Sequence, residues 1–276
     1  VDGVILHQRA CQWFEAEGYL AEAIQHSLAA KDWVKAVQLI NQVNDRMFKQ
    51  GEIVTMIGWL EKLPKEFILA QPDMCLIYAW ALLLAGKYNL VEPVLVQAEK
   101  LAQPGSVFLG QVATAQAYLA RSVGDNPRVI ETSRLALSLL PETEIANRSN
   151  LLMNLGLVYW HEGNLKEAEP ALIKAQVQSS QSGNLYAQLT SELFLARTLA
   201  SRGQLRESAE RFPSIIQRGP LVPIVALAYF DMGYLHYEWN ERETAEFYLQ
   251  QGLDLSHRTG NMEFQIAGLI LKVYLS

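Results

Sequence analysis

The sequence predicts an all-α protein: a right-handed superhelical solenoid of antiparallel helix pairs with a period of about 39 residues. Two observations predict it. A turn residue followed by a helix start recurs along the chain, and small residues recur at fixed distances on either side of that turn. Each such unit buries its apolar face only against its neighbours, so the units are expected to stack side by side.

The turn residues set the repeat, with successive spacings of 38, 39, 40 and 37 residues: Gly86, Gly124, Gly163, Gly203 and Asn240. Seven residues before each of them is a small residue that lets a neighbouring helix approach: Ala79, Ala117, Gly156, Ala196 and Gly233. Five residues after each is a small or β-branched one: Val91, Val129, Ala168, Ser208 and Ala245. Nine residues after, four of the five are large and fill the gap between two helices: Leu95, Ser133, Leu172, Phe212 and Leu249. Twelve residues after, the position is small again, with one misfit: Ala98, Ala136, Ala175, Ile215 and Gly252.

The first 70 residues follow this pattern only once. The stretch ACQWFEAEGYLAEAIQHSLAA is a degenerate copy, with Gly18 as turn residue and Cys11 and Ala23 at the small positions. We therefore expect an N-terminal helical capping segment over residues 1–70 and an array of about five helix-turn-helix units over residues 71–276.

Two further helices are predicted inside the capping segment. The first, KDWVKAVQLINQV, has an apolar stripe made of Trp33, Val34, Val37 and Ile40. The second runs from about Gly51 to Pro64. The chain starts at Val1, and its last residues continue an apolar helical pattern, so we expect a piece of a longer protein.

Composition and charge exclude several classes of function. Lys and Arg total 23 against 29 Asp and Glu, a formal net charge of −6 without a basic block, so no direct nucleic-acid partner is expected. The apolar run from Cys75 to Ala85 is about half of the roughly 20 residues that a membrane-spanning helix needs. Residues 1–20 lack a secretory signal pattern. We expect a cytoplasmic location and no membrane partner.

The sequence offers no catalytic or metal-binding set. His7 and Cys11 share a helix face, but no third ligand follows, which favours a packed cysteine over a metal site. His161 beside Glu162 and His236 near Glu238 do not form an HExxH motif. We expect neither an enzyme nor a bound cofactor, and we assign no catalytic or metal-ligating residue.

Two resemblances follow from these motifs. The small residues around each turn resemble the tetratricopeptide pattern, although the units are longer than its usual length. The run from LHQRACQWFEAEGYL through GEIVTMIGWLEKLP to CLIYAWALLLAGKY resembles the sensor region of the large ATP-dependent LuxR-type bacterial transcription regulators of the maltose-regulon-activator type. That resemblance implies an ATPase module and a DNA-binding module elsewhere in a parent chain. No GxxxxGK[ST] phosphate loop occurs here, so we assign ATP binding or hydrolysis to no residue of this sequence.

In a tetratricopeptide-like solenoid, the first helix of each unit lines a concave groove. On that template the candidate ligand-binding residues are Gln111, Tyr118, Arg121, Asn150, Trp160, His161, Arg197, Tyr234 and Tyr237. A sugar or similar metabolite would stack on Trp160 or Tyr234 and hydrogen-bond Arg121 and Arg197, whereas a peptide would present a carboxylate to the two arginines. Aromatic residues at helical spacing are also typical of the core between repeats, and the arginines also suit surface ion pairs.

Two functions are compatible with this reading. The first is an effector-sensing and protein-interaction domain of a bacterial transcription regulator, which binds an inducer or partner in the groove. The second is a scaffold that binds a peptide or partner domain and takes no small effector. A peptide clamp would repeat in successive units, whereas Arg121 and Arg197 lie two units apart, so the sensor ranks first.

Overall fold

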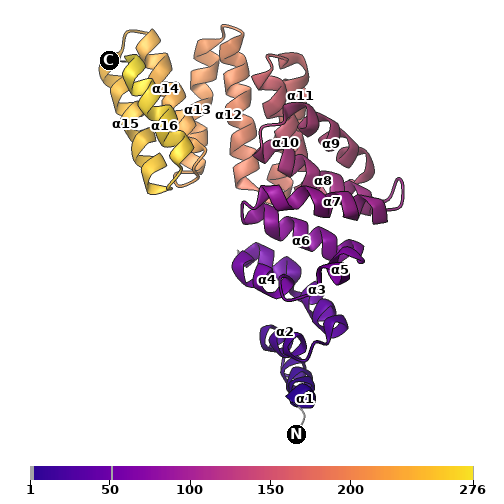
Figure 1. The fold of residues 1–276 in the computed structure, drawn as a ribbon. Coiled ribbons are helices and arrows are strands. Elements are labelled where there is room, and N and C mark those ends of the chain that lie inside the picture. Colours follow the sequence, from indigo (N-terminus) through magenta and orange to yellow (C-terminus); the bar gives the residue numbers. More distant parts are fainter. Residues whose placement is uncertain (1–2, 51, 276) are drawn as a thin grey trace. The chain divides into compact units, whose positions relative to one another are not determined.

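The computed structural model describes residues 3–50 and 52–275 and confirms an all-α array of antiparallel helix pairs. None of these residues is in a β-strand. The chain divides into two compact units, Val1–Leu140 and Pro141–Ser276, whose helices Figure 1 labels in chain order. The predicted division of the sequence after residue 70 stays a prediction.

In the first unit, a run of helices of varied length precedes two regular pairs. Its helices are α1 (Gly3–Ala16), α2 (Leu20–Ala29), α3 (Trp33–Gln50), α4 (Ile53–Leu60), α5 (Lys65–Leu69), α6 (Pro72–Leu84), the short 3-10 helix η1 (Tyr88–Leu90), α7 (Val91–Leu101), α8 (Val107–Ser122) and α9 (Asn126–Leu139). Helix α6 packs on α7, and α8 packs on α9. Gly51, at the start of the helix that α4 represents, lies outside the described residues.

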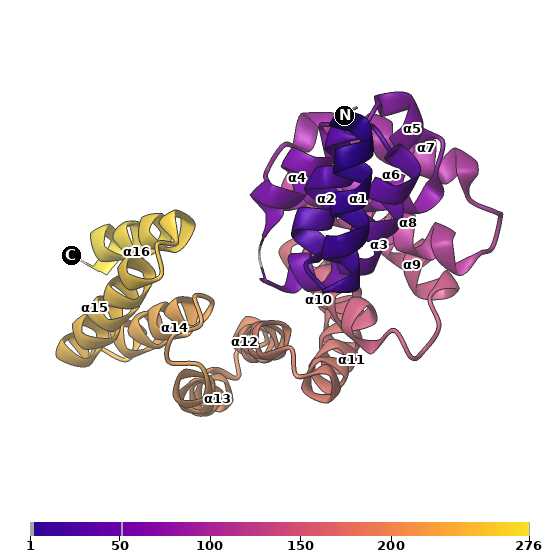
Figure 2. The same ribbon diagram turned by 90° about the horizontal axis from the view of Figure 1, so that it is seen from below.

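The second unit contains three regular pairs and a final helix. These are α10 (Ile145–His161) with α11 (Leu165–Ser182), α12 (Leu185–Ser201) with α13 (Leu205–Arg218), and α14 (Val225–Glu238) with α15 (Arg242–Arg258), followed by α16 (Met262–Leu275). Figure 2, which views α12 and α13 nearly along their axes, shows the two helices side by side. Helix α16 packs against both α14 and α15.

The five predicted turn residues all end a first helix in the left-handed region, with φ between 60° at Asn240 and 81° at Gly203. At Gly86, the amide donates to the Leu83 carbonyl and the next amide, of Lys87, donates to the Leu82 carbonyl. The same two bonds close α14 at Asn240. This is the Schellman arrangement, which satisfies the last carbonyls of a helix and needs a residue that tolerates positive φ. Glycine and asparagine stand there for that reason.

The small residues allow close helix packing as predicted. All five residues at each of the four predicted packing positions are buried. A Cβ atom on Gly156 of α10 would lie 2.5 Å from Leu172 Cγ of α11, the large residue nine positions after the turn. In the last pair, a Cβ on Gly252 would lie 2.4 Å from the ring of Phe230. Glycine therefore allows the close approach of the helices in two of the three pairs of the second unit.

One detail of the predicted packing is wrong. The apolar stripe on α3 was expected to include Val34, but that side chain is 71% exposed, and Trp33 is half-buried. Val37 and Ile40 are buried as expected, together with Ala36 and Leu39. The buried face of α3 is therefore rotated away from Val34 and toward Leu39 and Ile40.

Candidate functional site

The nine predicted groove residues fall into separate sets. Gln111, Tyr118 and Arg121 lie on α8 in the first unit, where the Tyr118 ring meets the Trp80 ring edge-on at 5.6 Å. The other six lie in the second unit. Of these, Asn150 accepts a hydrogen bond from the Asn184 side chain, at 3.0 Å. This pair joins the start of α10 to the residue that caps α12, so Asn150 has a structural partner.

Trp160, His161 and Arg197 are brought together, and two residues that the sequence did not single out join them. We name the five residues Trp160, His161, Phe194, Arg197 and Asp231 the Trp160 cluster. The Trp160 ring meets Phe194 edge-on at 5.1 Å and His161 edge-on at 5.3 Å. The Arg197 guanidinium carbon lies 5.0 Å from the Phe194 ring centre and 5.8 Å from that of Trp160, within cation–π range.

A two-pronged ion pair closes one side of the Trp160 cluster. Arg197 Nε donates to Asp231 Oδ2 at 2.7 Å, and Arg197 Nη2 donates to Asp231 Oδ1 at 2.9 Å. The two side chains are only 21% and 22% exposed. Burial raises the pKa of Asp231, while the charge and hydrogen bonds of Arg197 act in the opposite direction. The pair joins α12 to α14, one helix pair further along the chain.

One polar atom of the Trp160 cluster has no partner. The indole nitrogen Nε1 of Trp160 is buried, and no described residue accepts its hydrogen bond. A buried N–H without an acceptor costs about 1–3 kcal/mol. Next to it, His161 has a lowered pKa, first because its surroundings shield it from water and second because of the positive charge of Arg197. The imidazole is therefore neutral at pH 7.

Tyr234 and Tyr237 form another set with Tyr274 of α16. Their rings lie 6.0 Å and 5.9 Å from the Tyr274 ring. The pKa of Tyr234 is raised, chiefly because its hydroxyl hydrogen-bonds the Glu238 carboxylate. These two predicted residues thus pack against the last helix, while 41% of Tyr234 remains exposed.

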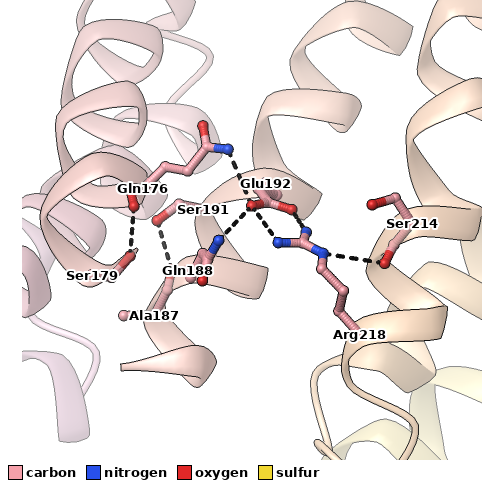
Figure 3. Close-up of polar contacts among 8 residues, drawn as sticks. All are labelled: Gln176, Ser179, Ala187, Gln188, Ser191, Glu192, Ser214 and Arg218. Carbon is pink, nitrogen blue, oxygen red and sulfur yellow. Dashed lines mark hydrogen bonds and ion pairs between the residues drawn. The ribbon is translucent and has the colours of Figure 1, made fainter. Parts of the chain in front are cut away.

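A second polar centre lies on α12 and is fully occupied by protein groups. Figure 3 shows the Glu192 carboxylate between three side chains. Its Oε1 atom accepts from Gln176, Gln188 and Arg218 at 3.1, 3.2 and 3.1 Å, and its Oε2 atom accepts from a second nitrogen of Arg218. Glu192 thereby ties α11 and α13 to α12. Because its oxygens already have these donors, Glu192 is a structural clamp and offers little to a ligand.

An open cleft of about 530 Å³ lies elsewhere, at the turn between α12 and α13, lined by residues 203–207 and by Trp239. None of the nine predicted residues lines it. Its Glu207 carboxylate accepts a hydrogen bond from Gln204 at 2.6 Å. The cleft is wide open to solvent, and none of the described side chains that line it has a buried polar atom without a partner.

Three findings bear on the other site classes. Among the described residues, no three His, Cys, Asp or Glu side chains are grouped so that they could hold a metal ion. No helix in the described part of the chain has both the length and the apolar character needed to cross a bilayer. Cys11 and Cys75 are buried free thiols, and burial raises the pKa of Cys75 to about 11, so this thiol stays protonated.

Comparisons with known proteins agree with the repeat. Residues 110–276 match the family model of the MalT-like TPR region. The HTH-type transcriptional regulator MalT of Vibrio campbellii is 23% identical over 260 residues, which cover 91% of this chain and 29% of that protein. The serine/threonine-protein kinase PknK of Mycobacterium tuberculosis is 36% identical over 101 residues, 34% of this chain and 9% of the kinase. The chain thus spans less than a third of the length of these relatives.

Two solved structures share the fold. A Rap protein complexed with Competence and Sporulation Factor has a TM-score of 0.62 at 14% identity, over 90% of this chain and 69% of that chain. The apo form of RapI has a TM-score of 0.55 at 13% identity, over 94% of this chain and 70% of that one. At these identities the likeness extends to the helical-repeat architecture alone.

Proposed function

Because the chain belongs to the MalT-like TPR region family, we propose that it is a non-enzymatic sensing and protein-interaction domain of a bacterial transcription regulator. In this proposal, an inducer or partner binds at the Trp160 cluster in the cytoplasm. An ATPase module and a DNA-binding module of a parent regulator then respond to the binding of this ligand.

The main observation in support of a ligand site at the Trp160 cluster is the unpaired indole N–H of Trp160. Buried donors in folded proteins nearly always have an acceptor, so the orphan donor supports placing an acceptor group of a ligand here. A ligand oxygen at this position would satisfy the donor, and it would lie beside His161 and the Phe194 ring. Among the described residues, the side-chain oxygens of Ser133, Gln178 and Thr190 are also buried without a partner, but none of these residues belongs to the Glu192 clamp or lines the cleft at Trp239.

The chemistry of the Trp160 cluster favours a small polar ligand with apolar faces. Trp160 and Phe194 offer aromatic surface, and His161 offers a neutral hydrogen-bond donor and acceptor. The Arg197–Asp231 pair offers further hydrogen-bond donors and acceptors, held in place by its two hydrogen bonds. A saccharide or similar metabolite combines C–H faces with hydroxyl acceptors and matches that mixture. Tyr234 and Tyr237, on the same helix as Asp231, form a separate aromatic set with Tyr274.

Ligand binding here would act by a shift of population. The Trp160 cluster draws on α10, α12 and α14, which are the first helices of three successive pairs. A ligand that contacts all three stabilises the arrangement of the pairs that fits it. It can shift the equilibrium between two arrangements only by its difference in affinity for them.

A scaffold that binds a peptide or partner domain is the alternative. One observation favours it: a similar solved structure, the Rap protein, is complexed with Competence and Sporulation Factor. In that case Arg197 would have to exchange Asp231 for a carboxylate of the partner.

A thermal-shift screen of this chain against saccharides, nucleotides, amino acids and short peptides tests the proposal. A ligand at a hundred times its dissociation constant should add about 2.7 kcal/mol of stability. We expect a small metabolite to raise the melting temperature. Trp160→Phe, which keeps an aromatic ring but loses the N–H, should lower the affinity for that ligand at least tenfold. Trp239→Phe is the matched control and should leave the affinity unchanged.

The outcomes separate the alternatives. A ligand whose affinity falls with Trp239→Phe and not with Trp160→Phe would move the site to the cleft. A shift produced only by peptides would favour the scaffold.

A further inference from the structure

Asp231 is the one acidic residue of α14 before its last position, in the otherwise apolar run VALAYFDMGYLHYE. Its neighbours in sequence, Phe230 and Met232, are buried. A carboxylate in such a setting is costly unless it is paired. Its partner is Arg197, at 2.7 and 2.9 Å, and both side chains are about four-fifths buried.

The pair changes what the Trp160 cluster offers to a ligand. Arg197 alone would be a planar cation beside two aromatic rings, which is a favourable site for a carboxylate or phosphate. With Asp231 in place, the charges cancel, and the Nε and Nη2 groups of the guanidinium already donate their hydrogen bonds to Asp231. The imidazole of His161 adds no charge at pH 7, because its pKa is lowered.

We propose that Asp231 sets the charge selectivity of the Trp160 cluster: it neutralises Arg197, so that the cluster accepts neutral hydrogen-bonding ligands and rejects carboxylate and phosphate anions. The inference rests on the proposed function, because it concerns the same site. An anion that approaches Arg197 meets the negative charge of Asp231 and must displace a two-bonded partner. A neutral hydroxyl or amide group uses the remaining N–H groups of the guanidinium, which has five in all, and leaves the pair intact.

The test uses two small probes of equal shape and different charge, benzoate and benzamide. Both carry a ring that fits an aromatic surface, and only benzoate is an anion at pH 7.5. Binding is measured by isothermal titration calorimetry on the wild-type chain, on Asp231→Asn, and on Asp231→Asn with Arg197→Met. Asp231→Asn keeps the shape and an acceptor oxygen but removes the charge. Asp231→Ser is a second neutral variant in case the first does not fold.

We expect the wild-type chain to bind benzamide at least tenfold more tightly than benzoate. Asp231→Asn should improve benzoate affinity at least tenfold and change benzamide affinity less than twofold, and adding Arg197→Met should abolish the gain. Preference of the wild-type chain for benzoate overturns the inference, and so does a folded neutral variant without any gain for benzoate.

These results are separable from the proposed function. If no ligand of the thermal-shift screen depends on Trp160, the proposed function fails while the gain for benzoate can still appear. If such a ligand exists but neutral variants of Asp231 gain nothing for benzoate, only the charge selectivity fails.

Discussion

The guanidinium of Arg197 and the carboxylate of Asp231 lie edge to edge, 34 residues apart in sequence, with hydrogen bonds of 2.7 and 2.9 Å. Arg197 belongs to the first helix of one pair, and Asp231 to the first helix of the next. The same guanidinium also lies over Phe194 and Trp160. Arg197 therefore both joins two successive helix pairs and forms part of the site at which we expect a ligand.

Asp231→Ala should lower the free energy of unfolding by about 1–3 kcal/mol, because it leaves a largely buried guanidinium without its charged acceptor. Chemical denaturation at pH 7 measures this. Replacing both partners by leucine should cost less than the sum of the two single changes, since no unpaired charge remains. Arg202→Met, which breaks an exposed ion pair with Glu169, is the control and should have a much smaller effect. Equal effects at the two sites would contradict this account of the pair.

Gly156→Ala should destabilise the second unit by about 1–3 kcal/mol, because the added methyl group would overlap Leu172 of α11. Gly58→Ala on α4 is the matched control. A Cβ there meets no other atom within 4 Å, and alanine favours a helix over glycine by up to about 1 kcal/mol. The two changes should therefore shift the unfolding midpoint in opposite directions. A neutral Gly156→Ala would show that the gap between α10 and α11 adapts.

The titration of His161 should respond to Arg197. In the folded chain its pKa lies below the ordinary value of 6.5, so its contribution to stability is complete above pH 6.5 and is lost as the pH falls toward the folded pKa. Arg197→Met should raise this pKa, because it removes a nearby positive charge. NMR titration of the imidazole resonances, assigned with His161→Gln, measures both values. An unchanged pKa would mean that shielding from water accounts for the whole shift.

Glu192→Ala should loosen α13 against α12, since Arg218 and two glutamines lose their common acceptor. We expect a loss of about 1–2 kcal/mol and faster amide exchange across Leu205–Arg218. Gln188→Ala removes only one of the donors and serves as the control. Exchange that accelerates equally in both variants would argue against Glu192 as the clamp.

Much of the fold follows from local chemistry. A turn that reverses a helix within three residues needs positive φ, which favours glycine or asparagine, so the recurrence of these residues locates the turn at Gly163. Lys31, with φ of 57°, is an exception between α2 and α3. Close helix approach needs a small residue, which locates the contact of Gly156 with Leu172. The rotation of α3 was harder to predict. Val34 and Val37 are equally apolar, and only tertiary packing leaves the first exposed.

The sequence named part of the Trp160 cluster. The groove template found Trp160, His161 and Arg197, but it omits the position nine residues before each turn, where Phe194 and Asp231 stand. A signal for Asp231 existed: a single carboxylate in an apolar helix requires a cation, and Arg197 lies close to one repeat earlier. No local pattern reveals which tryptophan lacks an acceptor, because that depends on atoms from several helices.

The Trp160 indole N–H resonance tests the central claim most directly. It is assigned in a ¹H–¹⁵N spectrum by its loss in Trp160→Phe and is followed while the best ligand of the thermal-shift screen is added. We predict that this resonance moves with ligand concentration and reaches its end point at the affinity found by calorimetry, as expected for an N–H that gains an acceptor. A ligand that binds with equal affinity while the Trp160 resonance stays in place would contradict the account.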